Sequence, residues 1–182
     1  MSGSYGVAPA VVATPGVALG SQWFAVQTRY RYEKKVAAQL GQKHCRVYLP
    51  LRTEHHGWSD REQRITVPLF PGYVFVHIDQ SRESRQAVLR TAGLLGFVSF
   101  GGTVTPVPSI QIEQLQLLLQ QKVPFSLHPF VQVGKRVRIR GGCLQGLEGV
   151  LVRNEESRIV ISIASIQRSL AIEIRGYELD LV

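Results

Sequence analysis

The chain has 182 residues, enough for one ordinary domain or two small ones, and its 45% hydrophobic and 19% charged content is typical of a globular protein rather than a disordered one. The formal net charge of +8 favours an anionic partner such as a nucleic acid, although a solvated basic surface explains it equally well. Residues 23–122 carry 13 basic and 7 acidic side chains, and residues 123–182 carry 8 and 6, so the first part is favoured for electrostatic contact.

The N-terminal residues 1–22 contain no charged side chain, which predicts a flexible tail. Pro9 and Pro15 interrupt the apolar stretch that a secretory signal needs, and no segment approaches the roughly 20 apolar residues of a membrane span. Cys45 and Cys143 match neither a metal-binding spacing nor a disulfide framework. We therefore expect a cytoplasmic, monomeric protein without metal or cofactor.

Strands and helices alternate through the first domain, which we place at residues 23–121. Strands are predicted over 23–28, 47–54, 64–68, 72–78 and 97–100, and helices over 32–43, 84–91 and 109–121. Ser109 is a candidate N-cap for the last helix, and the polar stretch 55–60 separates two of the strands. This order predicts an α+β sandwich with a sheet on one side and helices on the other.

The second domain, residues 132–182, has the pattern of an all-β fold. It follows residues 122–131, which lose periodicity, contain two prolines and are predicted to form a linker. Strands are predicted over 135–140, 147–152, 159–163, 170–174 and 177–182, with a polar turn at 154–157. Five short strands predict a small closed barrel, and the β-branched run 159–161 disfavours a helical form of this domain.

The segment 68–78, Pro-Leu-Phe-Pro-Gly-Tyr-Val-Phe-Val-His-Ile, joins a Pro-Gly turn to a nearly continuous apolar strand. Taken alone, it is explained by an ordinary core hairpin. Side chains alternate along a strand, so Tyr73 and Phe75 point one way and Val74 and Val76 the other. One set can therefore pack in a core while the other meets a partner.

Four separated blocks resemble, in order and spacing, the N-terminal domain of the NusG family of transcription elongation factors. They lie at residues 23–28, 32–36, 68–78 and 88–102. In the second domain, residues 133–139 and 146–151 resemble a KOW motif, whose fixed glycine falls at Gly149. The resemblance implies a NusG-type α+β domain, an SH3-like KOW barrel and a non-catalytic role.

The resemblance also implies two binding surfaces on the first domain. An apolar depression would dock on the clamp helices of bacterial RNA polymerase, lined by Phe70, Pro71, Tyr73, Phe75 and Val98. Non-template DNA would pass near the basic residues Arg29, Arg31, Lys35 and Arg90. Tyr30 and Tyr32 interleave with these cations in a way suited to stacking on unpaired bases, with a solvated helix start as the alternative.

The implied partner surface of the KOW domain consists of Leu144, Leu147 and Ile166. Housekeeping members of the family use aromatic residues here to meet a small-subunit ribosomal protein or the termination factor Rho. Leucines and Gln167 stand at those positions in this chain, which weakens both partner assignments, makes Rho doubtful and does not exclude the ribosomal protein. With the Pro-Leu-Phe-Pro turn and residues 97–101, these differences favour the specialised RfaH and UpxY antiterminators.

Two other functions stay open, a housekeeping elongation factor and a ribosome-associated KOW protein that binds RNA directly. The small charge excess of residues 123–182, 8 basic against 6 acidic, counts against the second. An enzyme is not expected, because Gly101–Gly102 and Gly141–Gly142 lack the lysine and helix of a phosphate loop. His55–His56 is better explained as a solvated loop than as a metal site.

Overall fold

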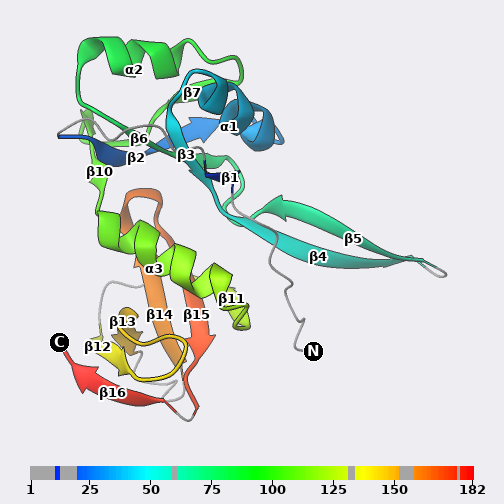
Figure 1. Ribbon diagram of the computed structural model, residues 1–182, viewed down its shortest axis with the longest axis vertical. Helices are drawn as coiled ribbons and strands as arrows, with labels where there is room; N and C mark the ends of the chain where they lie inside the picture. Colours follow the sequence, from blue (N-terminus) through cyan, green and yellow to red (C-terminus); the bar gives the residue numbers. More distant parts are fainter. Residues whose placement is uncertain (1–10, 13–19, 59–60, 131–133, 152–157, 176) are drawn as a thin grey trace. The chain divides into compact units, whose positions relative to one another are not determined.

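The computed structural model describes residues 11–12, 20–58, 61–130, 134–151, 158–175 and 177–182 (Figure 1). The chain divides into two compact units, one comprising Gly6–Ser109 and the other including Ile110–Val182. Each unit has its own antiparallel sheet. No helix in the described ranges is long and apolar enough to cross a membrane.

The main sheet of the first unit has the strand order β1-β3-β6-β2-β10, and β7 also pairs with β2. The strands are β1 (Val11–Val12), β2 (Gln22–Thr28), β3 (Arg46–Leu49), β6 (Tyr73–Ile78), β7 (Leu94–Phe97) and β10 (Pro106–Val107). In the central β2–β6 pair, Ala25 lies opposite Phe75 and Val26 opposite Val74. Each directly opposed pair points to one face of the sheet, so the register fixes which side chains share a face.

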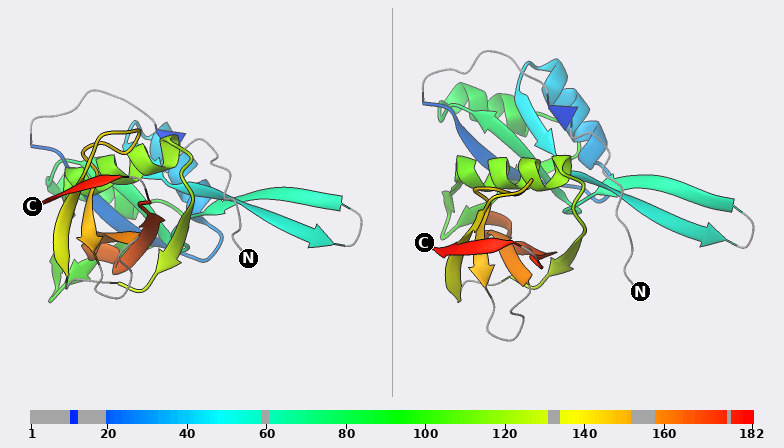
Figure 2. Two further views of the ribbon diagram at one scale, coloured as in Figure 1. Left: turned by 90° about the horizontal axis from the view of Figure 1, so that it is seen from below. Right: turned by 60° about the horizontal axis from the view of Figure 1, so that its bottom comes forward.

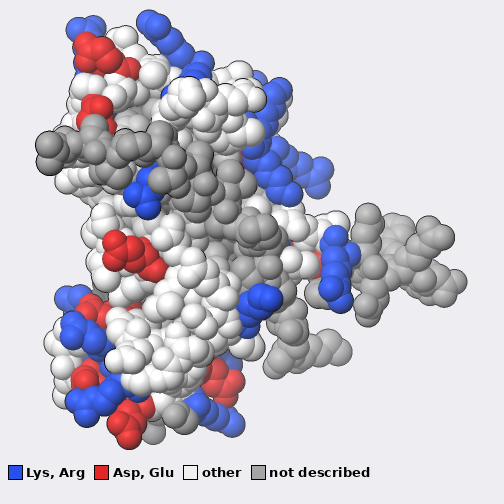
Figure 3. Space-filling model, in the orientation of Figure 1, with Lys and Arg blue, Asp and Glu red and all other residues white. Residues whose placement is uncertain are grey.

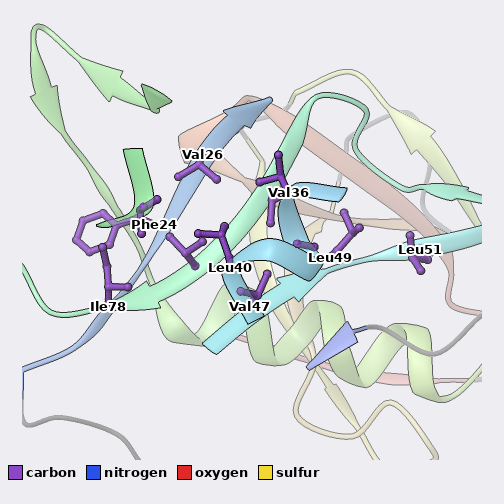
Figure 4. Packing of buried hydrophobic residues seen from close by; sticks show 12 residues of the cluster. Phe24, Val26, Val36, Leu40, Val47, Leu49, Leu51 and Ile78 are labelled. Carbon is purple, nitrogen blue, oxygen red and sulfur yellow. The ribbon is translucent and has the colours of Figure 1, made fainter. Parts of the chain in front are cut away.

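Two helices, α1 (Glu33–Gln42) and α2 (Arg82–Leu89), supply apolar side chains to one face of this sheet. Val36 and Leu40 of α1 are fully buried against sheet residues that include Phe24, Val47 and Leu49 (Figure 4). Each such side chain contributes about 1.5–3 kcal/mol by leaving water. The helix forms here because its apolar residues recur on one face, as the sequence predicts.

A long ribbon made of β4 (Leu51–Trp58) and β5 (Arg61–Pro68) extends beyond the sheet of the first unit (Figures 1 and 2). The pairing is continuous from Leu51 opposite Pro68 to Trp58 opposite Arg61. The prediction of a polar connection over 55–60 is therefore wrong for residues 55–58. Backbone hydrogen bonds hold the two strands together there, and these do not depend on an apolar side-chain pattern.

The helix α3 (Ser109–Gln120), which the sequence places at the end of the first domain, belongs from Ile110 onward to the second unit. The rest of that unit is an all-β fold, as predicted. Its strands follow the order β11-β15-β14-β13-β12-β16, with a short 3-10 turn, η1 (Ala164–Ile166), before β15. The bounds are β11 (Phe125–His128), β12 (Lys135–Arg140), β13 (Glu148–Leu151), β14 (Arg158–Ile163), β15 (Arg168–Glu173) and β16 (Glu178–Leu181). The β-branched residues of β14 thus form a strand and not a helix.

Several segments differ from their predicted organisation. The predicted strand 47–54 is divided between β3 in the main sheet and β4 in the ribbon, and the predicted strand 97–100 is divided between β7 and β8 (Ser99–Phe100). Strand β11 lies inside the expected linker and pairs with β15, from Phe125 opposite Ile172 to His128 opposite Ser169. Four residues between two prolines are too few to show a strand pattern. In the expected tail, Val11 and Val12 pair with β3. Residues 1–10 and 13–19 of that tail, and the predicted turn at 154–157, lie outside the described residues.

Gly149 lies in β13 and faces β14. A β-carbon at this position would come within 3.0 Å of the Val160 carbonyl oxygen and 3.3 Å of the Ile159 side chain. Its backbone is not among those with positive φ. The glycine of the KOW motif is therefore favoured here by the close approach of the neighbouring strand, and not by an unusual backbone angle.

Candidate functional site

Two hydrogen bonds of Gly72 hold the turn between β5 and β6 in place. Gly72, which has a φ of +83°, donates its N–H to the Glu33 carboxylate at 2.7 Å. Its carbonyl accepts a hydrogen bond of 2.9 Å from the Thr28 amide at the end of β2. The turn that carries Phe70 and Tyr73 is thus fixed against both the start of α1 and the end of β2.

Behind this turn lies an aromatic layer, formed by Trp23, Tyr48, Phe70 and Phe75. Phe75 stacks on Tyr48 with ring centres 6.3 Å apart, and the ring of Phe70 meets Phe75 edge-on at 6.4 Å. Trp23 meets Tyr48 edge-on at 6.5 Å. Val74 and Val76 belong to the core on the helix-covered face instead, so the predicted division of β6 into two faces is confirmed.

The Tyr48 hydroxyl is an unusual member of this aromatic layer. The Tyr48 side chain is fully buried, and its oxygen has no hydrogen-bond partner within the described part of the chain. Burial raises the pKa of this phenol well above its ordinary value, because the charged form would lose its hydration. The hydroxyl therefore remains protonated, and its donor has no acceptor among the described residues.

The surface that this region presents is smaller than the sequence predicts. Phe70 and Phe75 are 1% and 0% exposed, and Val98 is buried as well. Pro71 is exposed and Tyr73 is half-buried. Of the five residues predicted to line an open depression, only these two reach solvent, because the others pack into the aromatic layer or the sheet.

The predicted basic residues Arg29, Arg31, Lys35 and Arg90 are all exposed. The Arg29 amide donates to the Gly93 carbonyl at 2.8 Å, which joins the loop after β2 to the loop after α2. The structure therefore brings together two neighbourhoods that are far apart in the sequence, because Arg29 and Gly93 are separated by 93 − 29 = 64 positions. Lys and Arg side chains gather on the α1 side of this unit (Figure 3).

Aromatic and cationic side chains alternate at the start of α1. The guanidinium of Arg31 lies 5.6 Å from the ring centre of Tyr30, and the Lys35 ammonium lies 5.5 Å from that of Tyr32. Tyr30 is 74% exposed. This arrangement can offer a flat ring to a nucleobase and a cation to a phosphate within one turn of chain.

The predicted partner residues of the second unit do not form a surface. Leu144, Leu147 and Ile166 are 0%, 0% and 4% exposed, because they pack inward as the core of the small unit. The side chains that reach solvent in the same loops include Gln145 and Gln167, together with Cys143 and Ala164. The predicted apolar partner surface is therefore wrong for these three side chains.

Charges on the second unit are largely paired. Arg138 and Arg136 contact Glu148 at 2.5 and 3.6 Å, and Arg140 contacts Asp180 at 2.8 Å. These pairs run across the neighbouring strands β13, β12 and β16. Exposed pairs of this kind contribute little to stability, but they reduce the positive field available to a phosphate backbone.

Two functional candidates escaped the sequence analysis, the Glu33 carboxylate and the Tyr48 hydroxyl. An acidic residue in the first turn of a helix is an ordinary sequence signal, but its partner Gly72 is 39 residues away. No local pattern reveals such a contact. No group of three or more His, Cys, Asp or Glu in the described ranges could hold a metal ion.

Comparison with known proteins gives consistent results. The model of the family described as "Transcription termination factor nusG" matches residues 21–116, more than half of the chain. The NusG protein of Lactococcus lactis subsp. lactis (strain IL1403) is 28% identical over 175 residues, covering 90% of this chain and 95% of its own. That of Staphylococcus carnosus (strain TM300) is 26% identical over 153 residues, covering 78% and 84%.

A solved structure of Thermotoga maritima NusG superposes with a TM-score of 0.51 and 24% identity, covering 87% of this chain and 96% of that one. This likeness concerns the fold, an α+β domain followed by an all-β domain. The matched residues 21–116 contain the held turn, the aromatic layer and the basic loops described above. The chain belongs to the NusG family.

Proposed function

We propose that this protein is a non-catalytic transcription elongation factor that binds RNA polymerase through its first unit. The observation that carries the proposal is the family match over residues 21–116, which contains the turn and its aromatic layer. The relatives compared above are named transcription termination/antitermination proteins. The proposed partner is the pair of clamp helices of the large polymerase subunit, and the proposed effect is on pausing or termination.

The docking surface proposed here centres on Pro71 and Tyr73, with Phe70, Phe75 and Val98 beneath or beside them. A rigid aromatic side chain gives a large contact area at low entropic cost, which suits an anchor for a helical partner. Glu33 and Thr28 fix the turn that presents Tyr73. Direct contact with the buried rings requires a rearrangement that exposes them, whereas contact with Tyr73 does not.

The test is binding of the full-length chain to bacterial core RNA polymerase, with a clamp-helix peptide as competitor. Tyr73→Ala should weaken binding about tenfold or more, as expected for an interface anchor. Tyr177→Ala is the matched control, because Tyr177 is also partly exposed but lies in the second unit. Absence of competable binding by the folded wild-type protein would overturn the proposal.

Phe70→Ala is a poor first probe of docking. Phe70 is 1% exposed, and removing a buried phenylalanine ring costs about 3–5 kcal/mol of stability. A loss of polymerase binding by that variant could therefore reflect unfolding of the first unit. Tyr73 is only half-buried, so its truncation separates binding from folding more cleanly.

We further propose that Arg29, Arg31, Lys35 and Arg90 contact the exposed non-template DNA strand in the elongation complex. This proposal is supported by the exposure of all four side chains and by the backbone hydrogen bond that joins the two loops carrying them. Arg29→Ala should spare binding to the polymerase alone and weaken the DNA-dependent part. Equal loss of both by Arg29→Ala would contradict this division of roles.

Within the family, we propose a specialised antiterminator of the RfaH or UpxY type rather than a housekeeping factor. The supporting observation is the second unit, where Leu144 and Leu147 are buried and the exposed loop residues include Gln145 and Gln167. Leu144, Leu147 and Gln167 stand where the family is expected to have aromatic residues that meet Rho, although the partly exposed Tyr177 contacts Cys143 in the same loop. A ribosomal partner stays open. In a Rho-dependent termination assay the protein should not enhance Rho, and enhancement would identify a housekeeping factor.

A further inference from the structure

The ammonium group of Lys43 joins the ends of two helices that are far apart in the sequence. Lys43 directly follows α1, and its Nζ donates hydrogen bonds of 2.9 Å to the Ala87 carbonyl and 2.8 Å to the Thr91 hydroxyl. Ala87 lies in α2 and Thr91 follows that helix, so the two bonds span 44 and 48 positions of the chain. One side chain thus connects the end of the first helix to the end of the second.

This cation satisfies a requirement that α2 does not meet by itself. The last carbonyls of a helix have no partner within it, and a positive charge near them is favourable because that end of the helix dipole is negative. In a longer helix the Ala87 carbonyl would accept the Thr91 amide, but this amide donates to Val88 at 3.0 Å. The last turn of α2 also contains no basic residue. Lys43 therefore supplies, from α1, both the charge and the donor.

The segment that Lys43 holds is the α2 loop (residues 90–93), which carries one of the four cations proposed to contact DNA. Both acceptors of Lys43 flank Arg90 in the sequence, since Ala87 precedes it and Thr91 follows it directly. Thr91 is 3% exposed, whereas Arg90 is exposed. Arg90 is thus a solvent-facing cation on a segment that is fixed at both sides.

The α2 loop is also held against the residues that precede α1. The Arg29 amide donates to the Gly93 carbonyl at 2.8 Å, and a β-carbon at Gly93 would lie 2.3 Å from the ring of Tyr32. The loop therefore has one support at Gly93 and another at Thr91. The support at Gly93 includes a backbone hydrogen bond, whereas the one at Thr91 depends on the Lys43 side chain and can be removed by substitution.

We propose that Lys43 is a positioning residue for nucleic-acid binding, because its ammonium holds the α2 loop so that Arg90 and Arg29 meet neighbouring phosphates of one strand. The inference rests on the proposed DNA contact of the first unit and adds a residue that acts on it indirectly. Preorganised cations bind more tightly because less freedom is lost on binding. Without the ammonium, the α2 loop keeps its hydrogen bond at Gly93 but gains freedom at Thr91, and the affinity for DNA falls.

The experiment measures binding of a labelled ten-nucleotide DNA single strand to the full chain by fluorescence anisotropy. Lys43→Met removes the ammonium but keeps an unbranched side chain, and it should weaken binding about fivefold, as expected when one charge-assisted contact is misplaced. Lys43→Arg keeps the charge and the donors and should restore most of the affinity. The matched control is Arg82→Met, which removes one positive charge at an exposed position in the first turn of α2 and should bind within about twofold of the wild type.

Double-mutant cycles separate positioning from direct contact with a phosphate. Thr91→Val removes one acceptor of Lys43 without a change of charge, and Thr91→Ser keeps the hydroxyl as its control. If Lys43 acts through the α2 loop, Thr91→Val weakens strand binding, and Lys43→Met has little further effect in an Arg90→Ala background. If Lys43 touches a phosphate itself, Thr91→Val binds like Thr91→Ser and the losses from Lys43→Met and Arg90→Ala add. The second result would overturn the inference.

Binding to core RNA polymerase without DNA shows whether Lys43 has only a general structural role. Lys43→Met should bind polymerase like the wild type and keep the wild-type circular dichroism spectrum at the assay temperature. Equal losses of polymerase and strand binding would mean that the whole unit is disturbed, and the positioning role would be wrong. If the wild type does not bind the strand, the proposed DNA contact fails and this inference fails with it. If the wild type and Lys43→Met bind the strand equally well, only this inference fails.

Discussion

The carboxylate of Glu33 should contribute measurably to the stability of the first unit. It is 3% exposed and accepts the Gly72 amide at 2.7 Å, which is a hydrogen bond to a charged group. Such bonds contribute about 1.5–3 kcal/mol, and Glu33→Ala also leaves the amide without its partner. We therefore expect Glu33→Ala to lower the free energy of unfolding by about 2 kcal/mol. Glu33→Gln keeps a neutral acceptor and should cost about half as much.

Chemical denaturation followed by tryptophan fluorescence measures this effect, because both tryptophans of the chain, Trp23 and Trp58, lie in the first unit. Glu83→Ala is the matched control, since Glu83 also stands in the first turn of a helix but is exposed. It should change stability by no more than about 0.5 kcal/mol. If Glu33→Ala and Glu83→Ala unfold at the same denaturant concentration, the turn is not held by this hydrogen bond.

Three further predictions follow from single contacts. Gly93→Ala should destabilise the first unit and displace Tyr32, because the φ of Gly93 is +91° and a β-carbon there would lie 2.3 Å from the Tyr32 ring. We expect a lower melting temperature together with weaker binding to single-stranded DNA. Gly149→Ala should cost the second unit about 1–3 kcal/mol through overpacking against β14, as measured by circular dichroism, and an unchanged melting curve would contradict this. Burial, and secondly the charge of Arg46, lower the pKa of His77. As the pH falls, the unfolded chain therefore binds a proton at His77 before the folded chain does, and the free energy of unfolding should fall as the pH drops through about 6.5. The His77→Gln variant should lose less stability than the wild type between pH 7.5 and 5.5. Equal losses in the two proteins would refute the assignment.

Local periodicity predicted most of the elements. The strand β6, the helix α1 and the strand β12 follow from alternation or from a 3.6-residue repeat, and each is found within one or two residues of its predicted bounds. The segments that escaped prediction are held by pairing rather than by pattern. Strand β11 and the outer part of the β4–β5 ribbon form because a neighbouring strand satisfies their backbone groups.

The candidate site was predicted in part, and its errors share one cause. Sequence alternation separated Tyr73 and Phe75 from Val74 and Val76, but it could not show which faces are covered. Phe75 and Leu144 were expected at partner surfaces and are both 0% exposed. Exposure depends on what packs above a side chain, and such contacts join residues that are far apart in the sequence.

The hydrogen bond from Gly72 to Glu33 also joins the two proposed binding surfaces energetically. Glu33 stands between Arg31 and Lys34 at the start of α1, while Gly72 stands between Pro71 and Tyr73 in the turn. A strand of DNA that stiffens the helix start restricts the turn as well, and a docked helix at the turn restricts the helix start. Linkage is reciprocal, so DNA would raise the affinity for polymerase by the same factor as polymerase raises the affinity for DNA.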